Sequence, residues 1–515
     1  MTESSTTPNK SGKAIIFALL LLILANVGMR VARITADSAY ELPNGFRTVA
    51  PFRDEAAKAY EARAKTLTGS WTLHPMDQYE YWRKQSPVWV YSLWIWFEAF
   101  GVGYAQLRSV SVIFSAVTLL ILYLGLRRSS GGLPALFAVV FLGFNYYFFL
   151  YSRLGLMEPM LLCWITISLF LAIKSEDDWR YLPASVFVWA VAFFTKQSAV
   201  VFLPSLLLAV FFYCGSPFRK STWEKKAGAA SWALMLAILA VIAVMFFWSD
   251  FYIRFFVNLR HFLQWDPTWH SAIYMRVQPE RTVANVADAF GWNGIVRGWL
   301  MMMPVAFLLA VIELVLVIRD AVKRRGVPRH ELIVIAWLIT ARALLALSPH
   351  DVVRFHLLQF IPTVWLAALL LRRMLSTGRR TIVVAAIFLV MASAVFHLQY
   401  VAGFLANPRY TIADGGKRVE ELIGDREAAL VGEWAPAICF GTNYDYYHVR
   451  NIFNNDRERL SAFKITHLLL IRGEDRAGEY FREALPEVFE KRQGITDFKI
   501  KDDRVELYKV PPAGD

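Results

Sequence analysis

The sequence predicts a polytopic α-helical membrane protein that ends in a small α/β domain outside the membrane. The chain has 515 residues, of which 56% are hydrophobic, and its mean hydropathy is +0.39. A soluble chain of this length would split into two or three domains with polar surfaces, whereas here long apolar runs alternate with short charged loops. After about residue 403 the apolar runs shorten to strand length. We therefore divide the chain into a membrane domain, 1–403, and a soluble domain, 404–515.

A membrane-spanning helix needs about 20 apolar residues to cross a hydrocarbon core of roughly 30 Å. The first apolar run has no small-residue cleavage site and others follow it, so we interpret it as a retained span rather than a signal peptide. The shorter stretch 88–101 is rich in Trp and Tyr, which predicts a helix at the membrane interface. The eleven predicted spans are 14–33, 107–126, 133–151, 159–174, 182–195, 197–214, 228–248, 297–318, 331–348, 356–371 and 381–401.

Basic residues set the predicted orientation. Six successive loops on one side of the membrane are rich in Lys and Arg, which is typical of cytoplasmic loops; only Arg30 and Arg33 break the pattern. The N-terminus is then cytoplasmic and, because the number of spans is odd, the domain 404–515 lies outside the cytoplasm. Basic loops facing anionic lipid also account for much of the net charge of +13, so this charge does not indicate a nucleic-acid partner.

Three regions are left on the outer side: the loop 34–87, the segment 249–296 and the soluble domain. In that domain the apolar runs 428–431, 438–440 and 466–471 have strand length, and helical patterns lie between them. The alternating segments 498–500 and 505–510 predict a terminal hairpin. The chain has three cysteines without a pairing or metal-ligand spacing, so neither a structural disulfide nor a zinc site is predicted.

Charged side chains in or beside membrane spans are costly and are often functional. With the predicted topology they all fall at or near the outer face. A carboxylate there could take the proton from an acceptor hydroxyl, while Lys and Arg hold a phosphate leaving group. The combination suits a reaction between a hydroxyl and a phosphate-linked sugar. The residues are Asp54, Glu55, Lys84, Arg108, Glu158, Lys196, Arg342, His350, Asp351 and Arg354.

Each of these residues also has a structural interpretation. Asp54 and Glu55 are typical of the first turn of a helix, where acids are favoured. Glu158, before Pro159, is compatible with the start of a span. Lys84 and Lys196 are compatible with lysines that extend their ammonium groups to the membrane interface.

Arg342 is harder to explain as a surface residue. It lies roughly two helical turns inside the outer boundary of its span, which favours an ion pair or a phosphate contact. Glu313, in the preceding span, is a candidate partner but lies nearer the inner face.

Short motifs in a fixed order link these residues to a known superfamily. Their order and spacing over residues 14–400 resemble the protein O-mannosyltransferases and lipid A aminoarabinose transferases, which are polyprenyl-phosphate-dependent enzymes of the GT-C class. The motifs are Phe52-Arg53-Asp54-Glu55-Ala56, Gly69-Ser70-Trp71, Lys84-Gln85-Ser86-Pro87, Leu107-Arg108-Ser109, Gly155-Leu156-Met157-Glu158-Pro159, Phe194-Thr195-Lys196 and Arg354-Phe355.

The resemblance implies roles for single residues. It implies an Asp-Glu catalytic pair in which Asp54 is the base, and a second acidic position at Glu158, where many relatives have Asp. It places Lys84, Lys196 and Arg354 as donor or phosphate contacts, and we add Arg342 to this group. The relatives often have Lys-Pro-Pro where this chain has Lys84-Gln85-Ser86-Pro87, so the resemblance does not extend to the local geometry around Lys84.

The predicted function is therefore an inverting glycosyltransferase that moves a sugar from a polyprenyl-phosphate donor to an acceptor hydroxyl. The reaction is expected on the extracytoplasmic face, in the inner membrane of a bacterium. A protein, a lipid A-like glycolipid and a polysaccharide all fit as acceptor, and a divalent metal is compatible with two acids near a phosphate. The alternative is a transporter or flippase of lipid-linked saccharides. Transporters tend to have internal repeats and charges near the midplane, and neither is seen in this sequence.

Overall fold

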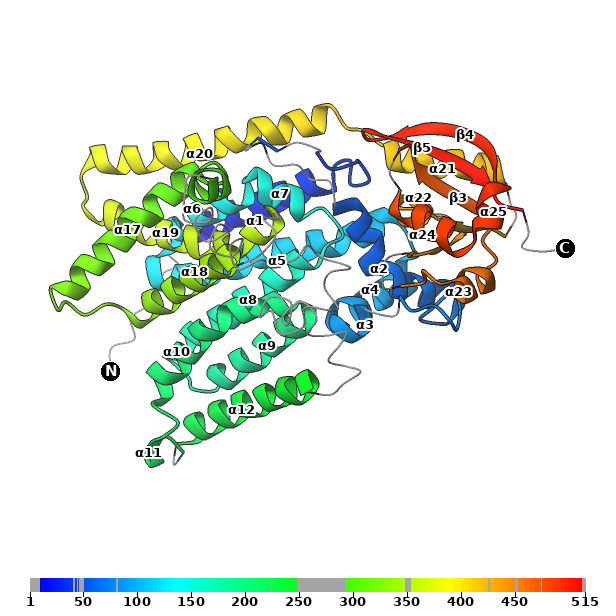
Figure 1. Cartoon of the computed structure of the whole chain (residues 1–515). Coiled ribbons are helices and arrows are strands. Elements are labelled where there is room, and N and C mark those ends of the chain that lie inside the picture. Colours follow the sequence, from blue (N-terminus) through cyan, green and yellow to red (C-terminus); the bar gives the residue numbers. More distant parts are fainter. Residues whose placement is uncertain are drawn as a thin grey trace.

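The computed structural model describes residues 10–39, 42–43, 45, 51–79, 82–223, 225–247, 293–347, 353–424, 427–449, 453–473 and 475–511. Most of the predicted outer segment 249–296 lies outside the described residues, as do His350 and Asp351. Figure 1 shows the long helices lying side by side, with the small α/β domain at one end of the bundle.

Every predicted span coincides with helical structure. The helices are α1 (Lys10–Val31), α5 (Tyr104–Ser130), α6 (Gly132–Gly143) with α7 (Tyr146–Tyr151), α8 (Met157–Lys174), α9 (Tyr181–Thr195), η1 (Gln197–Phe202) with α10 (Leu203–Cys214), α12 (Lys226–Phe247), η2 (Asn293–Leu300) with α17 (Pro304–Val322), α18 (Arg329–Leu347), η3 (Val353–Gln359) with α19 (Phe360–Ser376), and α20 (Arg380–Ala406). A four-residue helix, α11 (Lys220–Trp223), precedes α12.

Within the described residues, seven helical segments are long and apolar enough to cross a membrane, or eight if the bent pair η2–α17 is one span. Helices α6 and α9 are apolar but shorter. Large apolar side chains also point outward along the bundle: Phe17 is 64% exposed and Phe388 is 68% exposed. Such a surface suits contact with lipid rather than water. The polytopic helical class is confirmed, and the number of eleven spans stays a prediction.

Local sequence sets the breaks between helices. Gly131 adopts a φ of 89°, which glycine tolerates best, and its N–H bonds to the carbonyl of Arg127 to end α5 before α6 begins. Asn145 then separates α6 from α7, because its side-chain oxygen accepts a hydrogen bond from the N–H of Phe148 (3.0 Å). After these two breaks the chain continues into α8, where Glu158 lies in the first turn.

The predicted outer loop 34–87 contains two helices, α2 (Pro51–Thr68) and α3 (Trp82–Gln85), and the predicted interfacial segment forms α4 (Pro87–Phe100). All three helices lie between the bundle and the α/β domain (Figure 1). Trp89 and Leu93 on α4 are fully buried, whereas Tyr91 and Ile95 are exposed. One face of α4 therefore packs on α2 and α5, as expected for a helix at an interface.

The C-terminal part contains a five-stranded sheet in the order β2-β1-β3-β5-β4. Strand β1 pairs in parallel with β2 and β3, while β5 pairs antiparallel with β3 and β4. The elements are α21 (Thr411–Ile423), β1 (Ala429–Val431), α22 (Ala435–Cys439), β2 (Asp445–Tyr447), α23 (Arg457–Ala462), β3 (His467–Ile471), α24 (Arg476–Ala484), α25 (Pro486–Glu490), β4 (Gln493–Ile500) and β5 (Asp503–Lys509).

The strands predicted at 428–431 and 466–471 and the terminal hairpin are present. The run 438–440, which has strand length, instead ends the short helix α22, which has Pro436 in its first turn. An apolar run this short does not distinguish a buried strand from a buried helix, and the early proline favours the helix.

The α/β domain holds α2 in place through a buried arginine. Arg63 of α2 donates hydrogen bonds to the carbonyls of Phe440 (3.0 Å), Thr442 (2.8 Å) and Tyr444 (2.8 Å), just beyond α22. Backbone carbonyls at and beyond the end of a helix have no hydrogen-bond partner within the helix. The Arg63 guanidinium supplies N–H donors for these three carbonyls. Asp37, ahead of α2, accepts a hydrogen bond from the N–H of Thr411 (2.7 Å) at the start of α21. The domain therefore fixes the helix that carries Asp54.

Candidate active site

Five charged side chains meet at the end of the bundle nearest the α/β domain. Arg354 bonds to Asp54 through its Nη1 and lies 3.2 Å from Glu158 Oε1 through its Nε. Lys196 Nζ lies 2.5 Å from the same oxygen of Glu158, and Lys58 Nζ lies 3.7 Å from Asp54 Oδ2. We call these five residues the ionic cluster.

The residues of the ionic cluster come from four separate parts of the chain. Asp54 and Lys58 share one face of α2 because they are four residues apart. Glu158 lies in the first turn of α8, where an acid and the following Pro159 are both favoured. Lys196 lies at the extended residue between α9 and η1, and Arg354 belongs to η3.

Burial differs between the two acids of the ionic cluster. The Glu158 side chain is 3% exposed and the Asp54 side chain is 21% exposed, so Asp54 is the acid that a substrate can reach. Three cations face two carboxylates, which leaves one positive charge in excess. A mostly buried site with this balance favours an anion, because a phosphate would complete the pairing of the cations.

Burial and the neighbouring charges both shift the pKa of Lys58. Burial lowers the pKa of the Lys58 ammonium from its ordinary value, repulsion by Arg354 lowers it further, and attraction by Asp54 and Glu158 opposes both effects.

The ring of Phe355 lies under the other two cations of the ionic cluster, with its centre 4.6 Å from Lys196 Nζ and 5.6 Å from the guanidinium carbon of Arg354. A cation over an aromatic face gains electrostatic stabilisation without a carboxylate.

Glu55 belongs to a different network. Its two oxygens accept hydrogen bonds from Arg108 Nε (2.9 Å) and Nη2 (2.8 Å), and Oε1 also accepts one from the N–H of Gly155 (2.5 Å). Arg108 donates further to the carbonyls of Ile34 and Ala36, each at 2.8 Å. The fully buried Glu55 therefore holds α2 against α5 and against the turn at Gly155, just before α8.

Close packing accompanies the Glu55 network. A Cβ on Gly155 would lie 2.3 Å from Leu107 Cγ, so only glycine allows the N–H to approach Glu55 in this way.

Lys84 and Arg342 have other surroundings. Lys84 is half-buried in α3, beside Gln85, whose carbonyl accepts a hydrogen bond from Gln197 (2.5 Å), the residue after Lys196. Arg342 is buried in α18, with its guanidinium carbon 5.6 Å from the ring centre of Trp299. Glu313, which the sequence offered as a partner for Arg342, pairs instead with Arg373 at 2.8 Å. This pairing arises because α17 packs against α19, and Arg373 lies in the last turn of α19, at the end away from the ionic cluster.

The structure thus brings together four of the residues singled out in the sequence: Asp54, Glu158, Lys196 and Arg354. The sequence analysis did not single out Lys58. Its position four residues after Asp54, in a predicted helix, could have indicated that the two side chains share one helix face. Among the described residues, no group of three or more His, Cys, Asp or Glu side chains is arranged to hold a metal ion. The excess of cations in the ionic cluster also fits an anion better than a divalent metal.

Comparisons with known proteins agree with the predicted fold. Residues 84–248 match the family described as dolichyl-phosphate-mannose-protein mannosyltransferase. The structure is similar to ArnT from Cupriavidus metallidurans in the apo state (TM-score 0.59, 12% identity, covering 95% of this chain and 97% of ArnT). It is also similar to ArnT bound to undecaprenyl phosphate (TM-score 0.57, 12% identity, 98% of each chain).

A third similar structure is the oligosaccharyltransferase from Archaeoglobus fulgidus (TM-score 0.53, 11% identity, 96% of this chain and 73% of that one). No curated protein matches the chain in sequence. The predicted GT-C fold of a polytopic membrane protein is confirmed, and the family match supports the prediction of a glycosyltransferase.

Proposed function

We propose that this protein transfers a sugar from a polyprenyl-phosphate donor to an acceptor hydroxyl on the extracytoplasmic face of the membrane. The observation that carries the proposal is the ionic cluster, in which one reachable carboxylate stands beside three cations. The match to a dolichyl-phosphate-mannose-dependent family and the similarity to ArnT, whose structure holds undecaprenyl phosphate, both support this class of donor.

In the proposed reaction the acceptor oxygen attacks the anomeric carbon of the donor sugar. The bond from that carbon to the phosphate oxygen breaks, and the electron pair leaves with the polyprenyl phosphate. Asp54 receives the proton of the acceptor hydroxyl, and the configuration at the anomeric carbon inverts because attack and departure occur on opposite faces. Lys58, Lys196 and Arg354 stabilise the negative charge that grows on the leaving phosphate.

Glu158 has a positioning role in this mechanism. Its Oε1 contacts both Lys196 and Arg354, at 2.5 and 3.2 Å, and it is nearly inaccessible to solvent. A buried carboxylate between two cations fixes where their donors point, so that the phosphate meets a preformed site.

Donor binding also activates the base in this scheme. Arg354 is bonded to Asp54, and a cation on a carboxylate makes it a weaker proton acceptor. The donor phosphate competes for the same guanidinium, so its arrival releases Asp54 for the acceptor. The proposal therefore includes an order of binding, with donor before acceptor.

Orientation and location belong to the same proposal. The basic inner loops favour a cytoplasmic N-terminus and place the ionic cluster and the α/β domain, which we assign to residues 404–515, outside the cytoplasm. The bacterial plasma membrane is the expected site. A reporter fused after Val510 tests this orientation, because an alkaline phosphatase fusion is active only outside the cytoplasm.

The function itself is tested by mass spectrometry of glycolipids and glycoproteins from cells that express the wild type or Asp54→Asn at equal levels. We expect at least one pentose or hexose addition that is lost in the variant, together with accumulation of the lipid-linked sugar. Identical glycan profiles, or loss of the lipid-linked sugar from the outer leaflet alone, would contradict transfer and favour transport.

A further inference from the structure

Tyr151, the last residue of the short helix α7, lies beside the ionic cluster. Helix α7 contacts η3, the segment that carries Arg354, and the chain continues from α7 to α8, which carries Glu158 in its first turn. Arg354 and Glu158 are both close enough for their charges to act on the Tyr151 side chain. The phenol group therefore lies next to the part of the ionic cluster that these two residues form.

The hydroxyl group of Tyr151 is available to a ligand. It makes no hydrogen bond with any described residue, although Tyr151 is only 2% exposed. Two other buried tyrosines have a partner, since Tyr60 bonds to Asp77 and Tyr444 donates to the carbonyl of Gly424 (2.6 Å). The Tyr151 oxygen is not enclosed by the described residues, so part of its surface stays accessible. A phenol O–H without an acceptor in a mostly buried site favours a ligand that brings one.

Arg30 holds both ends of α7 in place. Its Nε donates to Ser152 Oγ (2.6 Å), directly after Tyr151, and its Nη2 donates to the carbonyl of Gly143 (3.1 Å), ahead of the helix. Its guanidinium carbon also lies 5.1 Å from the centre of the Phe148 ring. This anchoring gives Arg30 a role at the outer end of α1, where it breaks the pattern of basic inner loops. A hydroxyl on a helix that is fixed in this way is a preorganised donor.

The proposed transfer reaction increases the charge on the phosphate. In the donor the phosphate is a diester with one negative charge, whereas the leaving polyprenyl phosphate is a monoester with a charge of about −1.5 to −2 at pH 7. The ionic cluster has one positive charge in excess, which matches the diester but not the additional charge of the monoester. A neutral hydroxyl can stabilise this additional charge without adding a cation that would repel the other three.

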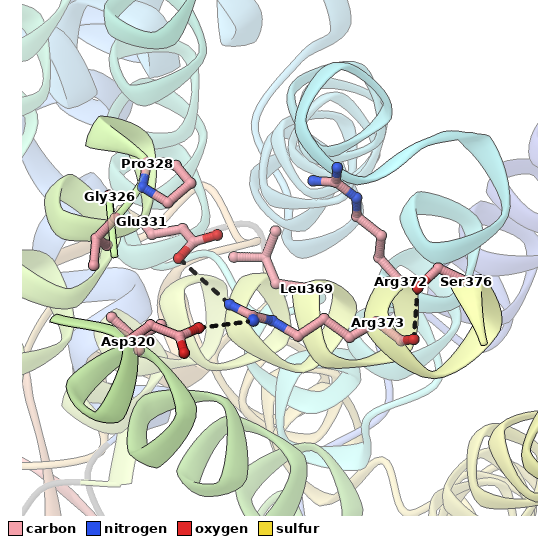
Figure 2. A pocket seen from close by; sticks show the side chains of 10 residues that line it. Asp320, Gly326, Pro328, Glu331, Leu369, Arg372, Arg373 and Ser376 are labelled. Atoms are coloured by element: carbon pink, nitrogen blue, oxygen red, sulfur yellow. Dashed lines mark hydrogen bonds and ion pairs between the residues drawn. The ribbon is translucent and has the colours of Figure 1, made fainter. Parts of the chain in front are cut away.

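The opposite end of the helical segment that begins with η3 has the reverse balance of charge. Arg373, in the last turn of α19, lies 2.8 Å from Glu313, 3.2 Å from Asp320 and 4.0 Å from Glu331 (Figure 2). Three carboxylates around one guanidinium leave no excess of positive charge beside Arg373, so a phosphate is disfavoured there. Phosphate binding by this protein should therefore report on the ionic cluster.

We propose that Tyr151 is a further catalytic residue of the proposed reaction, whose hydroxyl donates a hydrogen bond to the leaving phosphate. The inference rests on the proposed function, because the phosphate is the one released in that reaction. As the bond from the anomeric carbon to the phosphate oxygen breaks, the electron pair moves onto the phosphate, and the Tyr151 O–H stabilises the growing charge together with Arg354. Tyr151 keeps its proton throughout, since the proton of the acceptor hydroxyl goes to Asp54.

The test compares a phosphate monoester with a diester. Purified full-length wild type and Tyr151→Phe in detergent are titrated at pH 7.5 with undecaprenyl phosphate and with its methyl ester, which has one negative charge like the donor. We expect Tyr151→Phe to bind undecaprenyl phosphate about 10–100-fold more weakly than the wild type, because it lacks a hydrogen bond to a charged group. Binding of the methyl ester should change by less than about threefold, since a hydrogen bond to a less charged phosphate contributes less.

Tyr146→Phe is the matched control, because it removes a hydroxyl from the other end of α7, where the charge of Arg153 acts on the side chain. It should bind both compounds like the wild type. Because the Tyr151 hydroxyl makes no hydrogen bond with any described residue, Tyr151→Phe should also unfold at the wild-type temperature.

Three results would overturn the role of Tyr151 alone: unchanged binding of undecaprenyl phosphate by Tyr151→Phe, an equal loss for the monoester and the methyl ester, or a large drop in the melting temperature of this variant. The last result would mean that the hydroxyl serves the fold. A wild type that does not bind undecaprenyl phosphate would instead overturn the proposed function, and this inference with it.

Discussion

Asp54 and Glu55 are adjacent in the sequence, but their carboxylates belong to different ion-pair networks. Asp54 bonds to Arg354 and lies 3.7 Å from Lys58, whereas Glu55 is held by Arg108 at 2.8 and 2.9 Å. Successive residues of a helix point about 100° apart, so one side chain reaches the ionic cluster while the other enters the core. The two acids should therefore respond differently to the same substitution.

Replacing Asp54 with Asn should lower turnover by about 10²–10⁴-fold, because general-base catalysis typically contributes that factor. The melting temperature should change less than in Glu55→Gln, because the Asp54 side chain is 21% exposed and Arg354 keeps its contact with Glu158. Turnover is measured as release of polyprenyl phosphate with saturating donor. Asp414→Asn, in the first turn of α21, is the control. Near-normal turnover of Asp54→Asn would move the role of base to another acid.

Replacing Glu55 with Gln should instead act on stability. Arg108 would be left buried without its carboxylate, and removal of one partner from a buried ion pair costs about 3–5 kcal/mol. Thermal unfolding in detergent should show a large drop in melting temperature, with lower yield of folded protein. A variant with the wild-type melting temperature and no turnover would show that Glu55 takes part in the chemistry.

Replacing Arg354 with Gln should weaken donor binding, because a hydrogen bond to a charged group contributes about 1.5–3 kcal/mol, or roughly 10–100-fold in affinity. Arg354→Lys keeps the charge but not the planar fork, so it should recover part of the loss. The apparent affinity is measured by titrating a polyprenyl-phosphate sugar in single turnovers. Lys84→Ala, which removes a cation implied by the family resemblance, is expected to weaken donor binding as well. Unchanged affinity in Arg354→Gln would remove this residue from the phosphate site.

The α/β domain should lose stability at mildly acidic pH through His467. Burial, with repulsion by Lys509, lowers the pKa of this histidine from 6.5 to about 4. As the pH falls from 6.5 to 4, His467 binds a proton in the unfolded chain but not in the folded domain. The free energy of unfolding therefore decreases in this pH window. The melting temperature of the wild type should therefore fall more between pH 7.5 and 5 than that of His467→Gln. Equal decreases would mean that His467 does not contribute.

Much of the fold follows from the sequence because a membrane restricts the choices of the chain. Backbone groups in hydrocarbon must be satisfied within a helix, so apolar length alone locates the helices, and each predicted span has one. The apolar runs of strand length after residue 403 likewise predicted the strands β1 and β3 and the terminal hairpin. The prediction was wrong at the short run 438–440, because an apolar run of this length has the same pattern in a buried strand and in a buried helix.

The ionic cluster shows what the sequence could not decide. Charge type, position beside the predicted spans and the family resemblance singled out Asp54, Glu158, Lys196 and Arg354. Partner choice is different, since it depends on which way each side chain points once the helices have packed. Only the tertiary structure showed that Glu55 and Asp54 belong to different ion-pair networks and that Lys58 is part of the ionic cluster. It also showed that Glu313 pairs with Arg373 and not with Arg342.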